Sequence, residues 1–130
     1  MKKLLFGVLF ASMGFGANTA MADGWPLSVL GSWNVLANHS TGTLSITSQG
    51  TTGNCQPIAG TIFGNPIVGF YCSYSGRIHF LRNSGPTTFQ DYTGNLSQTG
   101  SPLYMGGTFA SDSGNGGEYN FGATSVPNIQ

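Results

Sequence analysis

The chain has 130 residues, of which only four are Lys or Arg and four are Asp or Glu. Beyond residue 22 there is no lysine, and two arginines against four acidic residues cannot supply the phosphate contacts that nucleic-acid binding needs. The lack of a basic stripe also argues against binding to an anionic membrane surface.

The first 22 residues predict a cleaved export signal. Lys2 and Lys3 form a basic start, residues 4–15 form an apolar run, and Ala20-Met21-Ala22 is a small-residue cleavage motif. The apolar run is shorter than the roughly 20 residues that span a bilayer. We therefore expect a secreted or periplasmic bacterial protein that begins at Asp23 and does not insert into a membrane after cleavage.

Beyond the signal, apolar and polar residues alternate between turn residues, which predicts strands and no helices. The predicted strands are residues 31–36, 43–47, 58–63, 67–74, 77–82, 88–96, 103–110 and 118–124. Short connections indicate one domain, residues 23–130, built as an antiparallel meander. With few charges to protect open edges, we expect an eight-stranded up-and-down barrel, with a sandwich as the alternative.

The two cysteines, Cys55 and Cys72, are expected to form a disulfide, because the chain reaches an oxidising compartment. Pairing of the two strands across Asn65-Pro66 would place Cys72 opposite Ala59, which is roughly 13 Å of strand from Cys55. A regular hairpin cannot bridge that distance. We therefore expect the loop at residues 49–57 to fold back over the barrel mouth, pinned by the disulfide. A metal or redox pair is the alternative, but C-x-x-C spacing is lacking.

Alternation along the three most regular strands predicts which side chains enter the barrel. The predicted inward residues are Ile78, Phe80, Arg82, Tyr92, Gly94, Leu96, Met105, Gly107 and Phe109. Large residues alternating with glycine suit a narrow barrel in which backbones crowd. Arg82 ends its strand near the rim, where it can reach a partner or stack on an aromatic ring.

Several motifs resemble known barrels. Residues 31–46, GSWNVLANHSTGTLSI, resemble the first hairpin of an avidin, a member of the calycin superfamily that also contains the lipocalins. The segments GTIFGNPIVGFY, IHFLR, QDYTGNL and MGGTF resemble a set of small uncharacterised bacterial secreted barrel proteins. The resemblance covers most of residues 31–124 and implies a calycin barrel. It also implies that Trp33 closes one barrel end beneath Arg82 or Arg77.

The resemblance does not carry biotin binding with it. An avidin pocket needs several tryptophans, whereas only Trp25 and Trp33 follow the signal in this chain. Val35 also stands where the avidin hairpin has an asparagine. Biotin is therefore not the expected ligand.

The residue pattern predicts no enzyme. His39 falls in a predicted turn and His79 faces outward, so neither is placed as a catalytic base. Asp91 and Glu118 are a carboxylate pair in principle, but Asp91 points outward and Glu118 follows a Gly-rich turn. The sequence contains no nucleophile elbow, phosphate loop or metal-ligand spacing. No cofactor or metal is expected.

The expected function is a non-enzymatic binding barrel whose partner is a small neutral or apolar molecule, a glycan or a protein. The predicted ligand-binding residues are Trp33, Tyr71, Arg82 and Tyr92. One alternative is a surface or matrix protein that forms homo-oligomers, because low charge weakens repulsion. Another is an inhibitor of a secreted enzyme that acts through residues 23–30 or 125–130. A lumen filled by its own side chains would move any binding site to the outside.

Overall fold

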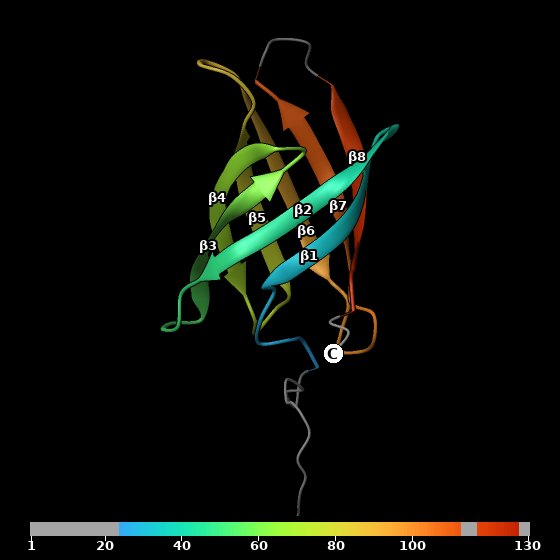
Figure 1. The fold of residues 1–130 in the computed structure, drawn as a ribbon. Coiled ribbons are helices and arrows are strands. Elements are labelled where there is room, and N and C mark those ends of the chain that lie inside the picture. The colour runs from blue at the N-terminus through green and yellow to red at the C-terminus, as the bar shows by residue number, and fades with distance from the viewer. Residues whose placement is uncertain (1–23, 113–116, 128–130) are drawn as a thin grey trace, which may run out of the picture.

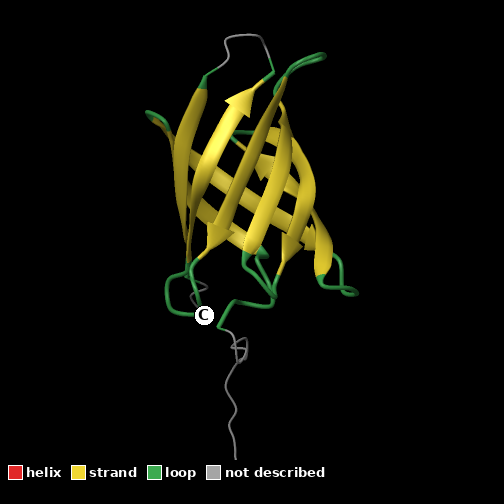
Figure 2. Cartoon of the chain, turned by 180° about the vertical axis from the view of Figure 1, so that it is seen from behind, coloured by secondary structure: helices red, strands yellow, loops and turns green. Residues whose placement is uncertain are grey.

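The computed structural model describes residues 24–112 and 117–127, so the predicted signal lies outside the described residues. The strands are β1 (Gly31–Ala37), β2 (Ser40–Gln49), β3 (Cys55–Ile62), β4 (Asn65–Cys72), β5 (Arg77–Asn83), β6 (Phe89–Leu96), β7 (Tyr104–Ser111) and β8 (Glu118–Ser125). Each strand pairs antiparallel with the next, and β8 pairs with β1 to close the barrel (Figures 1 and 2). The predicted up-and-down barrel is confirmed, and the sandwich alternative is wrong.

The two ends of the barrel differ. Residues 24–30 pass across the end where β1 begins, which we call the base (Figure 1). At the base, the indole Nε1 of Trp33 donates a hydrogen bond to the Val29 carbonyl at 3.1 Å, and the Tyr71 hydroxyl donates to the Pro26 carbonyl at 2.6 Å. We call the opposite end the mouth. The segment 24–30 therefore closes the barrel and is not a free tail.

The lumen is packed with aromatic rings. Phe80 stacks on Tyr92 at a centroid distance of 4.9 Å, and Tyr92 stacks on Phe109 at 4.8 Å. Phe121 meets the ring of Tyr92 edge-on at 5.3 Å. The predicted inward side chains of Ile78, Phe80, Tyr92, Leu96, Met105 and Phe109 are all buried, whereas Arg82 is half-buried. Because the lumen is filled, an internal ligand pocket of the lipocalin kind is not available.

Interior glycines allow the strands to approach this closely. A Cβ atom built on Gly60, Gly69 or Gly107 would lie within 2.0 Å of a carbonyl oxygen of the neighbouring strand. Gly94, a predicted interior glycine like Gly107, would place its Cβ 2.5 Å from the Gly106 carbonyl oxygen. Any side chain at these positions would push strands apart, which confirms the predicted role of Gly94 and Gly107.

The hairpin of β3 and β4 turns two residues earlier than expected. Ile62 pairs with Asn65, so Phe63 and Gly64 form the turn, with φ angles of 49° and 78°. Two residues with positive φ match the twist of adjoining strands, as in a type I′ turn. Pro66 belongs to β4, and pairing of β4 with β5 begins only at Ile67, so its missing N–H removes no bond of that ladder.

This register corrects the prediction for the cysteines. Cys55 lies directly opposite Cys72, with their Cα atoms 4.0 Å apart, and the disulfide joins them within the hairpin. The predicted disulfide is present, but the expected fold-back of residues 49–57 over the mouth is wrong. Strand β3 begins at Cys55, and the bridge lies near the base, where β3 begins and β4 ends.

Candidate functional site

The structure divides the four residues predicted to bind a ligand between the two ends of the barrel: Trp33 and Tyr71 lie at the base, whereas Tyr92 contacts Arg82 and both bond to Gln90 Oε1. Trp33, Tyr71 and Tyr92 have exposed fractions of 1%, 0% and 1%, so their rings belong to the core. Trp33 and Tyr71 bond to the segment at the base. Arg82 lies near the mouth, where its guanidinium is 5.2 Å from the centre of the Phe63 ring. The four residues therefore do not form one site.

The expected packing of a basic side chain over Trp33 is not found for Arg82. Trp33 lies near the start of β1, at the base, whereas Arg82 lies near the end of β5, at the mouth. Arg77 begins β5 at the base, but alternation turns its exposed side chain to the outer face. Phe63 takes the place of tryptophan over Arg82, because the early hairpin turn brings its ring to the mouth.

Two buried tyrosines have perturbed acidity. Burial raises the pKa of the Tyr71 hydroxyl to about 12, since the phenolate would lose its hydration. Burial also raises the pKa of Tyr92, and the positive charge of Arg82 partly opposes that rise. Both groups are therefore neutral hydrogen-bonding hydroxyls at ordinary pH and serve the packing of the barrel.

The raised pKa of Tyr71 predicts a loss of stability in alkali. The unfolded chain ionises near pH 10 and the folded one only near pH 12. The contribution of Tyr71 is therefore constant below pH 10, and stability falls by on the order of 1 kcal/mol per pH unit between those values. Urea unfolding from pH 8 to 12 measures this slope. Tyr71→Phe should reduce it and leave the part due to Tyr92. An unchanged slope in that variant would contradict the assignment.

A groove of about 860 Å³ lies on the outer face of the barrel, across β1, β2, β7 and β8. Two large side chains stand at it: Leu36, which is 53% exposed, and Tyr104, which is 54% exposed. Between them lies Gly122, which pairs with Leu36 on β1 and with Gly106 on β7. The groove depends on barrel closure, because β1 and β8 are neighbours only through the closing ladder.

The outer glycines differ physically from the interior ones. A Cβ on Gly122 would meet its nearest atom, the Met105 carbonyl oxygen, at 3.7 Å, and one on Gly106 would meet the Phe121 carbonyl oxygen at 3.6 Å. These are ordinary van der Waals contacts, and neither glycine has a positive φ. Packing would therefore accept a side chain at position 122. Because Gly122 has none, its backbone forms the floor of the groove.

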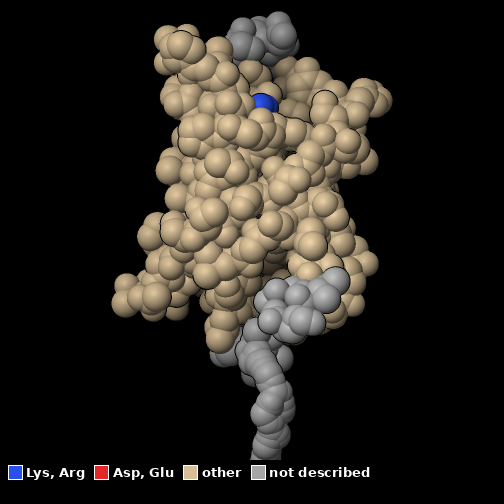
Figure 3. All heavy atoms as spheres, in the orientation of Figure 1, with Lys and Arg blue, Asp and Glu red and all other residues tan. Residues whose placement is uncertain are grey.

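All side chains that line the groove are uncharged. Asn34 and Thr124 pair across β1 and β8, and Tyr104 pairs with Thr124 on the other side. Among the described residues, the side chains of Asn34, Asn120 and Thr124 make no hydrogen bond to protein, and Asn34 and Asn120 are exposed. The face seen in Figure 3, over β1 and β2, is almost wholly uncharged, with a single basic spot near the mouth.

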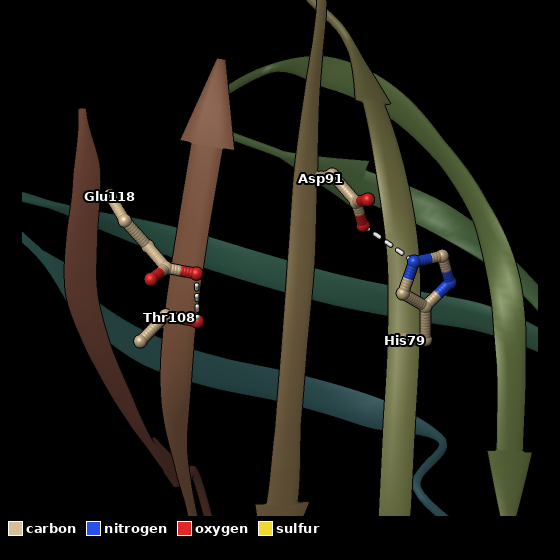
Figure 4. Close-up of polar contacts among 4 residues, drawn as sticks. All are labelled: His79, Asp91, Thr108 and Glu118. Carbon is tan, nitrogen blue, oxygen red and sulfur yellow. Dashed lines mark hydrogen bonds and ion pairs between the residues drawn. The ribbon is translucent and has the colours of Figure 1, made fainter. Parts of the chain in front are cut away.

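The residues that were considered for acid–base chemistry, and not predicted to be catalytic, form two separate contacts on the outer surface. His79 Nε2 and Asp91 Oδ1 are 2.5 Å apart, and Phe70 stacks on the His79 ring at 5.4 Å. Glu118 accepts a hydrogen bond from the Thr108 hydroxyl at 3.2 Å. Figure 4 shows that Asp91 and Glu118 each turn to their own partner and not toward each other. The two carboxylates are therefore not arranged as an acid–base pair.

Further findings place limits on the site. In residues 24–112 and 117–127, no three His, Cys, Asp or Glu side chains gather as metal ligands. The same residues contain no helix long and apolar enough to cross a membrane. No protein-family model matches this chain, and no curated protein sequence matches it. The closed eight-stranded barrel is compatible with the calycin fold that the sequence resembles.

Sequence reasoning missed the groove residues. Alternation along 103–110 and 118–124 already places Tyr104 and Gly122 on the outer face, which was an available signal. Their proximity to Leu36 was not available, because it requires the register between the first and last strands. A search for exposed aromatic residues beside outward glycines would have found Tyr104.

Proposed function

We propose that this protein is an exported, non-enzymatic binding barrel that holds an uncharged glycan in the outer groove between Leu36 and Tyr104. The observation that carries the proposal is the lining of that groove, which combines an exposed tyrosine ring with amides and hydroxyls and no charge. Sugar rings offer apolar C–H faces and a rim of neutral hydroxyls, which match an aromatic ring and asparagine side chains respectively.

The form of the groove supports an extended ligand. Its volume of about 860 Å³ falls in the range of small-molecule sites, roughly 300–1,000 Å³. The groove lies on the outer surface of four strands and not inside the packed lumen, so a chain of sugar units can lie along it. An ionic ligand would find no charge among its lining residues to offset its desolvation.

Two further proposals accompany this one. We infer export to the periplasm or the medium from the signal pattern of residues 1–22, and the Cys55–Cys72 disulfide supports an oxidising destination. We also infer membership among the calycin-like barrels. The closed up-and-down topology supports this, as does the burial of Trp33 at the base, which the resemblance implies.

The groove is tested by titrating neutral hexasaccharides of glucose and N-acetylglucosamine into the protein by calorimetry. Tyr104→Ala is expected to weaken binding roughly tenfold, because a stacking ring of this kind contributes about 1 kcal/mol or more beyond its area. Gly122→Leu should abolish binding, since its side chain fills the floor without a backbone clash.

The matched control is Tyr74→Ala, which removes a ring that is 58% exposed in the turn between β4 and β5. That variant should bind as the wild type does. Unfolding curves must show that all three variants stay folded. Equal affinity of Tyr104→Ala and wild type, or a wild type that binds none of the neutral oligosaccharides, would refute the groove as a glycan site.

A further inference from the structure

A second cavity, of about 220 Å³, opens at the mouth of the barrel. Its walls combine three apolar side chains with three polar ones: Ala37, Phe63, Phe109, Ser40, Gln90 and Arg82. This cavity is separate from the outer groove, and its lining differs from that of the groove in carrying a positive charge.

The Arg82 guanidinium is held rigidly in this cavity. Its Nε and Nη2 atoms donate to Asn65 Oδ1 at 3.1 and 2.6 Å, and its Nη1 donates to Gln90 Oε1 at 2.7 Å. A guanidinium has five N–H groups. A fourth hydrogen bond joins Arg82 to the Tyr92 hydroxyl, so one N–H group finds no acceptor in the part of the chain that the structure describes. The two amides fix the orientation of the guanidinium group but do not accept from all of its N–H donors.

No carboxylate of the described residues neutralises Arg82. Asp91 pairs with His79, Glu118 accepts from Thr108, and Asp112 Oδ1 accepts from the backbone N–H of Phe89 at 2.8 Å. A half-buried cation without a counter-ion is unfavourable, and the Phe63 ring offsets this only in part. The mouth therefore holds an oriented positive charge whose partner is absent from the described chain.

We propose that the mouth binds the carboxylate of a small organic acid through Arg82, independently of the glycan groove. A carboxylate would neutralise the guanidinium charge and accept its remaining N–H group. Phe63, Phe109 and Ala37 would contact the apolar body of the ligand. Because the cavity is smaller than typical drug-sized sites, a one-ring or short-chain acid fits it best.

The proposal is tested with benzoate as the probe, followed by calorimetry and by the NMR signal of the Arg82 Nε–H group. Wild type should bind benzoate and shift that signal, whereas neutral benzamide should do neither. Arg82→Gln should weaken benzoate binding roughly tenfold or more, since it removes the charge and the charge-assisted hydrogen bond to the carboxylate. Arg82→Lys should bind with intermediate affinity, because it keeps the charge but loses the fork.

Arg77→Gln is the matched control, because it removes the same charge from the outer face at the base and should leave benzoate affinity unchanged. Ser40→Phe narrows the cavity while keeping Arg82, and should also weaken binding, which covers the case of an Arg82 variant that does not fold. Benzoate binding unaffected by Arg82→Gln, equal binding of benzamide, or binding of inorganic phosphate but not of benzoate would each overturn the proposal. Glycan binding is measured in the same variants and should be unaffected.

Discussion

Replacement of Phe80 by alanine is expected to lower the free energy of unfolding by about 3–5 kcal/mol. The Phe80 side chain is fully buried, stacks on Tyr92 at 4.9 Å and meets Phe121 edge-on at 6.4 Å. Its removal deletes buried apolar surface and leaves a void between rings that cannot all move inward. Since the free energy of unfolding of such domains is only about 5–15 kcal/mol, the variant would be only marginally stable. Urea unfolding monitored by circular dichroism measures the change.

The same variant tests whether the lumen of the wild type is filled. A void lined by apolar side chains stays dry and can take up benzene, so benzene should raise the melting temperature of Phe80→Ala and not that of the wild type. Tyr104→Ala removes an exposed ring and is the control, with an expected loss within about 0.5 kcal/mol. A loss of that small size for Phe80→Ala, or benzene binding by the wild type, would show that the barrel is hollow.

Removal of the disulfide by the double substitution Cys55→Ala and Cys72→Ala is expected to cost about 3 kcal/mol. The bridge closes a segment with a sequence separation of 17 residues, and its loss restores conformational freedom to the unfolded chain. Cys55 is the first residue of β3 and Cys72 is the last residue of β4, so the rest of the barrel should stay folded without the bridge. Unfolding of oxidised wild type, reduced wild type and the double variant gives the comparison.

Reduced wild type serves as the control for the packing of the cysteine side chains. It should match the double variant to within the error of the unfolding curves, because both lack the covalent link. Equal stability of all three forms would show that the hairpin register alone holds β3 and β4 together, and would contradict a stabilising role for the bridge.

The fold could be predicted largely because it follows from local pattern. Alternation identified every strand and the inward faces of β5, β6 and β7, since side-chain direction in a strand has a period of two. The error at the β3–β4 hairpin also has a local cause. Pro66 was interpreted as a turn residue, whereas the positive φ of Phe63 next to Gly64 forms the turn. Because the predicted register was wrong by two residues in the turn, it did not place Cys55 opposite Cys72 in the hairpin.

The candidate sites could be predicted much less well. Trp33, Tyr71 and Tyr92 have the residue types of a binding rim, but in this narrow barrel their rings are needed to fill the lumen and close the base. Arg82 was predicted at the rim, and the structure adds the two amides that orient it and the Phe63 ring beside it. These partners come from other strands, so spacing along the chain does not reveal them.

By itself the sequence determined the strand content, the pairing of neighbouring strands and the near-absence of charge, because each depends on residue type and local order. Only the tertiary structure decided that the lumen is full, that Gly122 is a bare floor beside Leu36, and that Arg82 has no carboxylate partner among the described residues. The physical reason is that a cavity, or the neutralisation of a charge, depends on residues that are distant in sequence and become neighbours only on folding. Closure of β8 onto β1 creates the groove. The space that side-chain packing leaves empty at the mouth forms the second cavity.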